Sequence, residues 1–411
     1  EIPEFHFHKV APLFSNLPEA KQTVDIQPME QFNQGWGTIL YRTTLPETTL
    51  AGTTLKITEV HDWAQIYADG KLLARLDRRK GEFTTTLPAL KKGIQLDILV
   101  EAMGRVNFDK SIHDRKGITE KVELISGNQT KELKNWTVYN FPVDYSFIKD
   151  KKYSDTKILP TMPAYYKSTF TLDKVGDTFL DMSTWGKGMV WVNGHAMGRF
   201  WEIGPQQTLF MPGCWLKEGE NEILVLDLKG PTRASIKGLK KPILDVLREK
   251  APETHRKDGE KLKLAGEKVI HEGAFTPGNG WQEVRFATPV KGRYFCLEAL
   301  SPQANDNIAA IAEFDVLGAD GKPVSREHWK IRYADSEETR SGNRTADKIF
   351  DLQESTFWMT VDNVPYPHQL VIDLSKVENV TGFRYLPRAE KGYPGMIKEY
   401  RVYVKPADFN Y

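Results

Sequence analysis

The chain has 411 residues, with 56 Lys and Arg against 55 Asp and Glu and a formal net charge of +1. This length predicts roughly two to four domains, and the charge balance gives no support for a nucleic-acid or anionic-membrane partner, which would need a basic face. There is no apolar run of about 18 residues to span a membrane, and two cysteines cannot form a disulfide framework. Because the chain starts at Glu1 without a methionine or a signal-peptide pattern, we expect a cut or mature piece of a longer protein.

Short strands separated by turn residues dominate the sequence pattern. Residues 54–60, 63–67 and 94–100 mix alternating or continuous apolar residues with β-branched types, close to Gly, Asp or Asn. Sustained helical periodicity is nearly absent, and its best candidate is the segment 242–249. The pattern predicts an all-β protein with three β-sandwich or jelly-roll domains and no TIM barrel.

Composition shifts divide the chain into five segments. The first has few strand signals and apolar residues without a periodic partner, which predicts a lead-in with an exposed apolar patch that packs on another surface. A stretch crowded with Lys, Glu and Arg predicts a solvated linker with a short helix. The segments are a lead-in at 1–31, a first β domain at 32–148, a second at 149–232, the linker at 233–263 and a third β domain at 264–411.

Several long motifs, in order, resemble the accessory β domains of family 35 glycoside hydrolases, the retaining β-galactosidases. The first domain carries Gly-Trp-Gly-Thr-Ile-Leu-Tyr-Arg-Thr-Thr at 35–44, with further matches at 60–70 and 99–107. The second resembles the galactose-binding-like domain of that family, at 177–182, 185–194, 198–201, 204–212 and 219–226.

The resemblance implies a parent enzyme that hydrolyses terminal β-D-galactosides, secreted, periplasmic or on the cell surface of a bacterium. Its two catalytic glutamates would lie on a barrel upstream of Glu1, about 5–5.5 Å apart, so we expect this chain alone to be inactive. The pair Asn221-Glu222 matches the family's acid/base pair in residue type only. It lies in a turn that feeds a strand, which favours a structural role.

One loop of the first domain is expected to reach the missing barrel. The resemblance places residues 103–108 against the barrel, with Phe108 near the rim of the galactose pocket, where a tyrosine is common in the family. Arg105 and Asn107 are predicted to fix the loop and the domain interface through hydrogen bonds.

The third domain resembles discoidin-like domains, the fold shared with family 32 carbohydrate-binding modules. Motifs of the first half of such a domain come last in this chain, and those of the second half come first, which indicates a circular permutation. This predicts that Phe409 lies near residue 264 and that 325–333 forms a strand near the sheet edge. The late motifs are 346–351, 355–358, 367–374, 380–388 and 397–404, and the early ones are 280–286, 292–298 and 311–316.

Such modules often hold a structural calcium, and the residues in the corresponding places here are Glu313, Asp351 and Thr356. Their oxygens are the hard ligands that calcium prefers. However, Gln353 stands where an acidic ligand is usual, so a metal-free loop held by hydrogen bonds stays open as the alternative. No other cofactor is expected.

Sugar binding in these modules uses loop residues at one end of the sandwich. The candidates here are Trp281, Tyr366, His368 and Tyr393, and each has a packing role as its alternative. The leading hypothesis for the chain is the accessory region of a β-galactosidase, with the catalytic barrel and a galactose-containing carbohydrate as partners. An autonomous lectin-like protein and an adhesion module remain alternatives.

Overall fold

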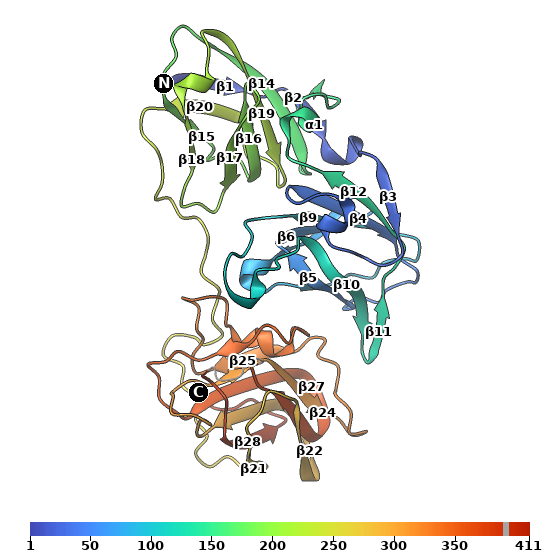
Figure 1. Ribbon diagram of the computed structural model, residues 1–411. Coiled ribbons are helices and arrows are strands. Elements are labelled where there is room, and N and C mark those ends of the chain that lie inside the picture. The colour runs from blue at the N-terminus through green and yellow to red at the C-terminus, as the bar shows by residue number, and fades with distance from the viewer. Residues whose placement is uncertain (389–393) are drawn as a thin grey trace. The chain divides into compact units, whose positions relative to one another are not determined.

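The computed structural model describes residues 1–388 and 394–411, and these are almost entirely β-structure (Figure 1). The all-β prediction is therefore confirmed, and the described residues show no TIM barrel. No helix among them has the length and apolar character to span a membrane. The chain forms two compact units: the first is Glu1–Gln22, Phe32–Leu40 and Thr137–Lys250, and the second is Thr23–Gln31, Tyr41–Trp136 and Ala251–Tyr411.

The first unit contains two sheets that enclose one apolar core, with Trp185, Phe7 and Tyr166 at its centre. One sheet has the order β1 (Ile2–His6), β20 (Ser235–Leu239), β15 (Thr178–Asp181) and β18 (Thr208–Met211). The other has the order β13 (Ser154–Asp155), β2 (Lys9–Pro12), β14 (Ala164–Leu172), β19 (Gly219–Asp227), β16 (Lys187–Val192) and β17 (His195–Trp201). Short helical turns are η1 (Leu13–Ser15), α1 (Tyr145–Ile148) and η5 (Gly213–Trp215).

The beginning of the chain is part of this core, and the prediction of an exposed apolar lead-in is wrong. Strand β1 pairs with β20, and β2 pairs with β14, so each completes one of the two sheets. The side chains of Ile2, Phe7, Val10 and Leu13 are buried. Strand β1 has only five residues, so its alternation does not stand out in the sequence. Its partner β20 lies more than 200 residues away, so no local hairpin pattern reveals the pairing either.

The pair Asn221-Glu222 lies at the beginning of β19 and has a structural role, as predicted. Asn221 is fully buried, and its Nδ2 donates to the carbonyl oxygens of Lys217 and Gly219, at 2.8 and 3.1 Å. Asn193 donates to the Asn221 Oδ1 at 2.8 Å, and Asn193 and Gly194 both have positive φ, as a type I′ hairpin requires. The Glu222 carboxylate accepts a hydrogen bond from the Tyr145 hydroxyl at 2.7 Å, which ties β19 to α1.

The predicted linker contains no helix at 242–249; this part of the prediction is wrong. Its backbone bonds instead to the loop before β18: Gln207 N donates to the Ile243 carbonyl oxygen at 2.9 Å, and Val246 N to that of Pro205 at 3.0 Å. These bonds replace the i to i+4 bonds of a helix, so the segment is extended. The beginning of the predicted linker is strand β20.

The first β domain contains a six-stranded and a four-stranded sheet. The six-stranded sheet has the order β3 (Ala20–Thr23), β12 (Trp136–Phe141), β4 (Thr38–Thr44), β9 (Gln95–Glu101), β6 (Trp63–Ala68) and β7 (Lys71–Asp77). The four-stranded sheet has the order β11 (Gln129–Glu132), β10 (Gly117–Ser126), β5 (Thr54–His61) and β8 (Thr84–Thr86). The helical turns are η2 (Met29–Phe32), η3 (Arg78–Lys80) and η4 (Asp109–Ser111). Strands β5, β6 and β9 lie within one or two residues of the predicted 54–60, 63–67 and 94–100.

The third domain lies within the second unit and has one main sheet. Its order is β21 (His271–Ala274), β28 (Glu399–Lys405), β22 (Gln282–Ala299), β27 (His368–Leu386) and β24 (Glu313–Leu317), and β25 (Lys330–Ala334) also pairs with β27. A second, small sheet joins β23 (Ala310–Ile311) and β26 (Trp358–Met359), and η6 spans Ala346–Phe350.

Both halves of this domain share one core, as the permuted order requires. Phe295 and Phe314 from the early half pack against Phe383 of the late half, with ring centroids 5.7 and 5.4 Å away. Lys263 forms a β-bridge with Asn410, so the two ends of the domain meet, with Phe409 and Leu264 in one cluster. The expected strand 325–333 is shorter than predicted, because a turn closed by Trp329 N and the Arg326 carbonyl oxygen precedes β25.

Replacing Phe7 by alanine tests whether the beginning of the chain stabilises the first unit. Phe7 is buried, and its ring lies edge-on to Trp185 at 5.0 Å. We expect Phe7→Ala to lower the free energy of unfolding by about 3–5 kcal/mol, the usual cost for a buried phenylalanine. Urea unfolding followed by tryptophan fluorescence measures it, with Val175→Ala, at an exposed position of the same unit, as the control. Equal stability of both variants would contradict this packing.

Candidate functional site

A balanced set of buried charges lies beside the loop that was predicted to reach a catalytic barrel. Lys116 is fully buried, and its Nζ donates to Asp62 Oδ2 at 2.6 Å and to Asp114 Oδ2 at 2.9 Å. Arg78 Nη1 lies 2.7 Å from Asp62 Oδ1 and 2.7 Å from Asp114 Oδ1. Two cations thus neutralise two carboxylates, which is the condition for burying either pair.

This network also holds the backbone of the loop 103–108. Met103 N donates to Asp62 Oδ2 at 2.6 Å, and Val106 N donates to Asp114 Oδ2 at 3.0 Å. Lys116 Nζ donates to the Gly104 carbonyl oxygen at 3.1 Å. The two carboxylates therefore set the path of the loop through its peptide groups, whatever its side chains are.

The predicted loop residues differ in their surroundings. Arg105 Nη1 donates to the Asp114 carbonyl oxygen at 2.7 Å and pairs with Glu30 at 2.8 Å, so its side chain connects the loop to both residues. Asn107 is exposed, and Phe108 has 81% of its surface exposed. Val106 and Ile112 are exposed as well. A loop with a fixed backbone thus presents apolar side chains outward.

The Asp114 carboxyl group is held in its ionised form. Burial alone would raise its pKa, but hydrogen bonds from Lys116, from Val106 N and from Arg78 together hold the pKa below its usual range. A lowered folded-state pKa means that the stabilisation is fully present above the pKa of an unfolded aspartate, about 4, and is lost as the pH falls below it.

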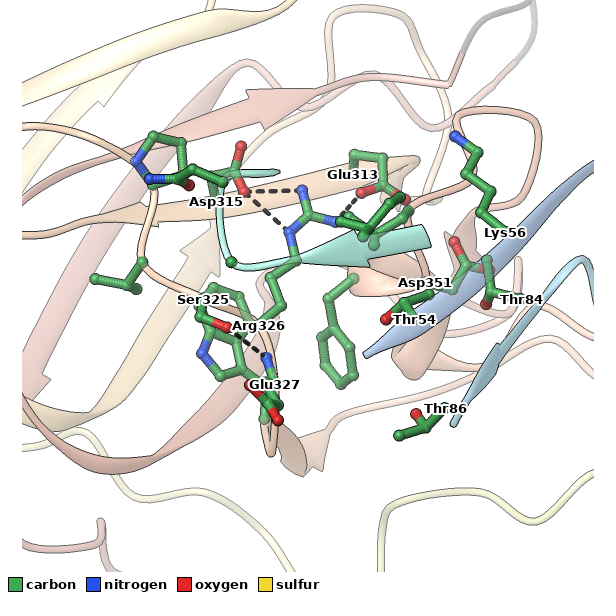
Figure 2. Close-up of a pocket in the computed structure, with 18 of the residues that line it drawn as sticks. Thr54, Lys56, Thr84, Thr86, Glu313, Asp315, Ser325, Arg326, Glu327 and Asp351 are labelled. Carbon is green, nitrogen blue, oxygen red and sulfur yellow. Dashed lines mark hydrogen bonds and ion pairs between the residues drawn. The ribbon is translucent and has the colours of Figure 1, made fainter. Parts of the chain in front are cut away.

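The second candidate region is a pocket within the second unit, shown in Figure 2. Its wall from the third domain includes Trp281, Arg384 and Glu354. The Arg384 guanidinium lies 4.4 Å from the centre of the Trp281 ring, and Trp281 Nε1 lies 3.4 Å from Glu354 Oε1. Hydroxyl groups face the same pocket from Thr54, Thr84 and Thr86, as Figure 2 shows.

The base of this pocket holds two of the three predicted calcium ligands. Glu313 Oε1 and Asp351 Oδ1 both accept from Gln353 N at 3.0 Å, and Asp351 Oδ2 accepts from Thr356 Oγ1 at 2.7 Å. The second oxygen of Glu313 pairs with Arg326 (Figure 2). Burial raises the pKa values of both Glu313 and Asp351, the first against the opposing charge of Arg326 and the second against the Thr356 hydrogen bond.

These contacts do not fit the calcium prediction. Calcium takes six to eight oxygens at about 2.3–2.6 Å, whereas the oxygens of Glu313 and Asp351 already accept hydrogen bonds from donors of this chain. Among the residues that the structure describes, no group of three or more His, Cys, Asp or Glu side chains is arranged to hold a metal ion.

Two other predicted sugar-binding residues, His368 and Tyr366, do not line the pocket with Trp281. His368 is fully buried in β27, with Nδ1 2.8 Å from Asp335 Oδ2 and Nε2 2.6 Å from the Asn307 carbonyl oxygen. Tyr366 donates to the Ile308 carbonyl oxygen at 2.8 Å and packs on the core. His368 thus lies buried in a strand and not in a loop, whereas Tyr366 lies in the loop before β27, as expected, and is half-buried there. Tyr393 lies outside the described residues.

Among the pocket residues that the sequence-based interpretation missed are Arg326, Arg384 and Asp315. One signal was available for two of them. Asp315 of β24 is the direct cross-strand partner of Arg384 in β27, so the opposite charges face each other across the sheet. Arg326 follows a turn with no strand pattern, and only the fold brings it to Glu313.

Comparison with known protein families identifies three parts of the chain. Residues 27–142 match the family "Beta-galactosidase, first all-beta domain", and residues 163–221 match "Beta-galactosidase, galactose-binding domain". Residues 333–411 match "F5/8 type C domain". The chain carries β-galactosidase-related accessory domains followed by a discoidin-like domain. This confirms the resemblance that the motifs indicated.

Curated relatives that are named beta-galactosidases or beta-galactosidase-like proteins align with about half of this chain. The chain is 34% identical over 205 residues to human "Beta-galactosidase-1-like protein 2", 33% over 211 to a beta-galactosidase of Xanthomonas manihotis and 35% over 255 to that of Bos taurus. These alignments cover 48%, 51% and 54% of the chain but only 30%, 34% and 37% of the relatives. The chain thus spans about a third of the length of the curated relatives it matches.

Solved structures are matched only remotely. One example is the apo form of the Pleurotus ostreatus lectin, with 11% identity, a TM-score of 0.19 and coverage of 58% of this chain and 82% of the lectin. Likeness at this level supports no argument about the β-galactosidase-related domains or their function.

Replacing Lys116 by methionine tests the buried network of the first domain. The change leaves Asp62 and Asp114 with one cation fewer, and breaking a buried pair in this way usually costs about 3–5 kcal/mol of unfolding free energy. Lys91→Met, at an exposed position, is the matched control.

We expect the stability difference between Lys116→Met and the wild type to shrink as the pH falls below about 4. There Asp114 takes up a proton in the unfolded chain, whereas Lys116 helps to hold its pKa lower in the folded wild type. Urea unfolding from about pH 7 down to about pH 2, which extends well below the pKa of an unfolded aspartate, measures it. A difference that does not change with pH would contradict the charge network.

Proposed function

We propose that this chain is the accessory region of a secreted β-galactosidase, in which it supports a catalytic (β/α)₈ barrel and binds galactose-containing carbohydrate. The relatives that carry the matching domains are named beta-galactosidases, and about two thirds of their length lies outside the match. In this proposal the barrel supplies the two catalytic glutamates, and the 411-residue chain supplies none.

The observation that carries the supporting role is the loop 103–108 of the first domain, together with the residues that follow it up to Ile112. Its backbone is held by Asp62 and Asp114, and it presents Val106, Phe108 and Ile112 to the outside. Exposed apolar groups of this kind mark interaction surfaces. A rigid loop adds little ordering cost when it binds, so it suits permanent contact with a barrel rim.

The carbohydrate-binding role is supported by the pocket around Trp281. Carboxylates, guanidinium groups and threonine hydroxyls line it, and these are the groups that hydrogen-bond sugar hydroxyls. Because Arg384 covers one face of Trp281, the ring acts as a wall that excludes water, and the polar groups give the orientation. The pocket belongs entirely to this chain, so the same observation supports the alternative of an autonomous lectin-like protein.

An activity assay distinguishes the accessory region and the lectin-like protein from an enzyme that acts alone. We expect the pure 411-residue chain to show no hydrolysis of an aryl β-galactoside, because the described residues contain no barrel with paired carboxylates. A chromogenic assay measures this, with an intact β-galactosidase as the positive control. Turnover that disappears when one of the chain's own glutamates is changed would refute the accessory role.

Titration with galactose and lactose tests the carbohydrate site. We expect Trp281→Ala to weaken binding about tenfold, since an aromatic wall contributes about 1 kcal/mol or more beside its burial. Trp36→Ala, at another partly exposed tryptophan that does not line the pocket, is the control and keeps full affinity. Calorimetry measures both. Absence of binding by the wild-type chain would reject the carbohydrate-binding half of the proposal and leave the supporting role intact.

A further inference from the structure

Three carboxylates lie close together in the third domain, and two of them are almost completely buried. Glu313 and Asp315, on β24, have 2% and 3% of their surface exposed, and Asp351 follows η6. Phe314 and Val316, between and beside them, point into the apolar core. Buried carboxylates are strongly unfavourable unless cations or hydrogen bonds compensate them, so this face of β24 needs positive charge.

Arg326 supplies that charge. Its Nη1 pairs with Glu313, and its Nε and Nη2 lie 2.9 and 2.8 Å from Asp315 Oδ1. Figure 2 shows the guanidinium group between these two carboxylates, with dashed lines to both. The Arg326 side chain is itself only 11% exposed. The planar guanidinium carries five donors in a fixed fork, which matches two carboxylates that lie apart along one strand.

The same arginine also connects separate parts of the domain. A turn at 318–324 leads to it, with Val324 N bonded to the Val316 carbonyl oxygen at 2.9 Å. Three residues later Trp329 is buried, and its ring meets Phe350 of η6 edge-on at 5.9 Å. Arg326 thus joins β24 to the connection before β25, while Glu313 and Asp351 share the Gln353 N–H.

We propose that the Arg326 guanidinium takes the place of a structural cation in this domain, so that its fold does not depend on calcium. A divalent ion would need the oxygens of Glu313 and Asp351 together with further ligands. Arg326 binds Glu313 Oε2, and Gln353 and Thr356 donate to the other oxygens of this pair. The positive charge is part of the chain and cannot be removed by a chelator.

The first experiment compares the wild-type chain with millimolar calcium and with EDTA. Hydrogen exchange of the β24 and β27 amides, read by mass spectrometry, follows this domain separately from the others. We expect equal protection and equal melting temperature under both conditions. Slower exchange or a higher melting temperature in calcium would overturn the proposal, because a ligand bound only to the folded state stabilises it.

The second experiment changes the arginine. We expect Arg326→Gln to lower the melting temperature of the domain by about 10 °C, because it removes the positive charge. Arg326→Lys should lower it by less, because the ammonium group still pairs with one of the two carboxylates. Arg401→Gln removes an exposed pair with Glu272 in the same domain and is the control, with little effect expected.

An unchanged melting temperature in Arg326→Gln would overturn the proposal. If that variant does not fold, the comparison of calcium with EDTA on the wild-type chain still decides it, together with the Arg326→Lys variant. Neither experiment depends on carbohydrate binding. The results of both would therefore stand even if the proposed function were refuted.

Discussion

The buried carboxylates at the two candidate sites need cations, and this requirement determines how both sites are built. Lys116 and Arg78 meet it in the first domain, and Arg326 and Arg384 meet it in the third. The desolvation cost of such groups is large, so removing one partner is much more harmful than never having had the pair. The backbone segments that bond to these charges are consequently tied to the buried networks.

The most deeply buried cation is Lys116 in the first network and Arg326 in the second, and this difference has a physical reason. Asp62 and Asp114 surround a single point, where an ammonium group with three donors can also reach the Gly104 carbonyl oxygen. Glu313 and Asp315 lie side by side on one strand, and the wide fork of a guanidinium spans them. The first arrangement fixes a loop, and the second joins a strand to a connection.

Much of the fold could be predicted because its signals are local or come in long motifs. The strands at 54–60 and 63–67 show their alternation within a few residues, and Asn193-Gly194 marks its hairpin directly. Strand β1 could not be found this way, since its burial depends on β20, at the other end of the first unit. The segment 242–249 has a helical pattern but bonds to the loop at 203–207, where tertiary contacts outweigh local preference.

The candidate site was predictable only in part, because residue type does not reveal accessibility. Trp281 was expected at a sugar site and Glu313 and Asp351 at a calcium site, and the fold brings all three to one pocket. His368 has the right chemistry for a sugar ligand, yet Asp335 and Asn307 occupy both of its ring nitrogens. The pair of Asp315 and Arg384 could have been found from the strand register, because it places their opposite charges directly across from each other.

Asp315 links the base of the pocket to its wall. One of its oxygens binds Arg326 and the other binds Arg384, which in turn lies over the Trp281 ring. The order from the buried glutamate to the pocket wall is therefore Glu313, Arg326, Asp315, Arg384 and Trp281. In such a series of charged hydrogen bonds each member restricts the next. The position of the tryptophan is thus set from inside the domain, and a cation that belongs to the chain keeps that setting independent of the ions in solution.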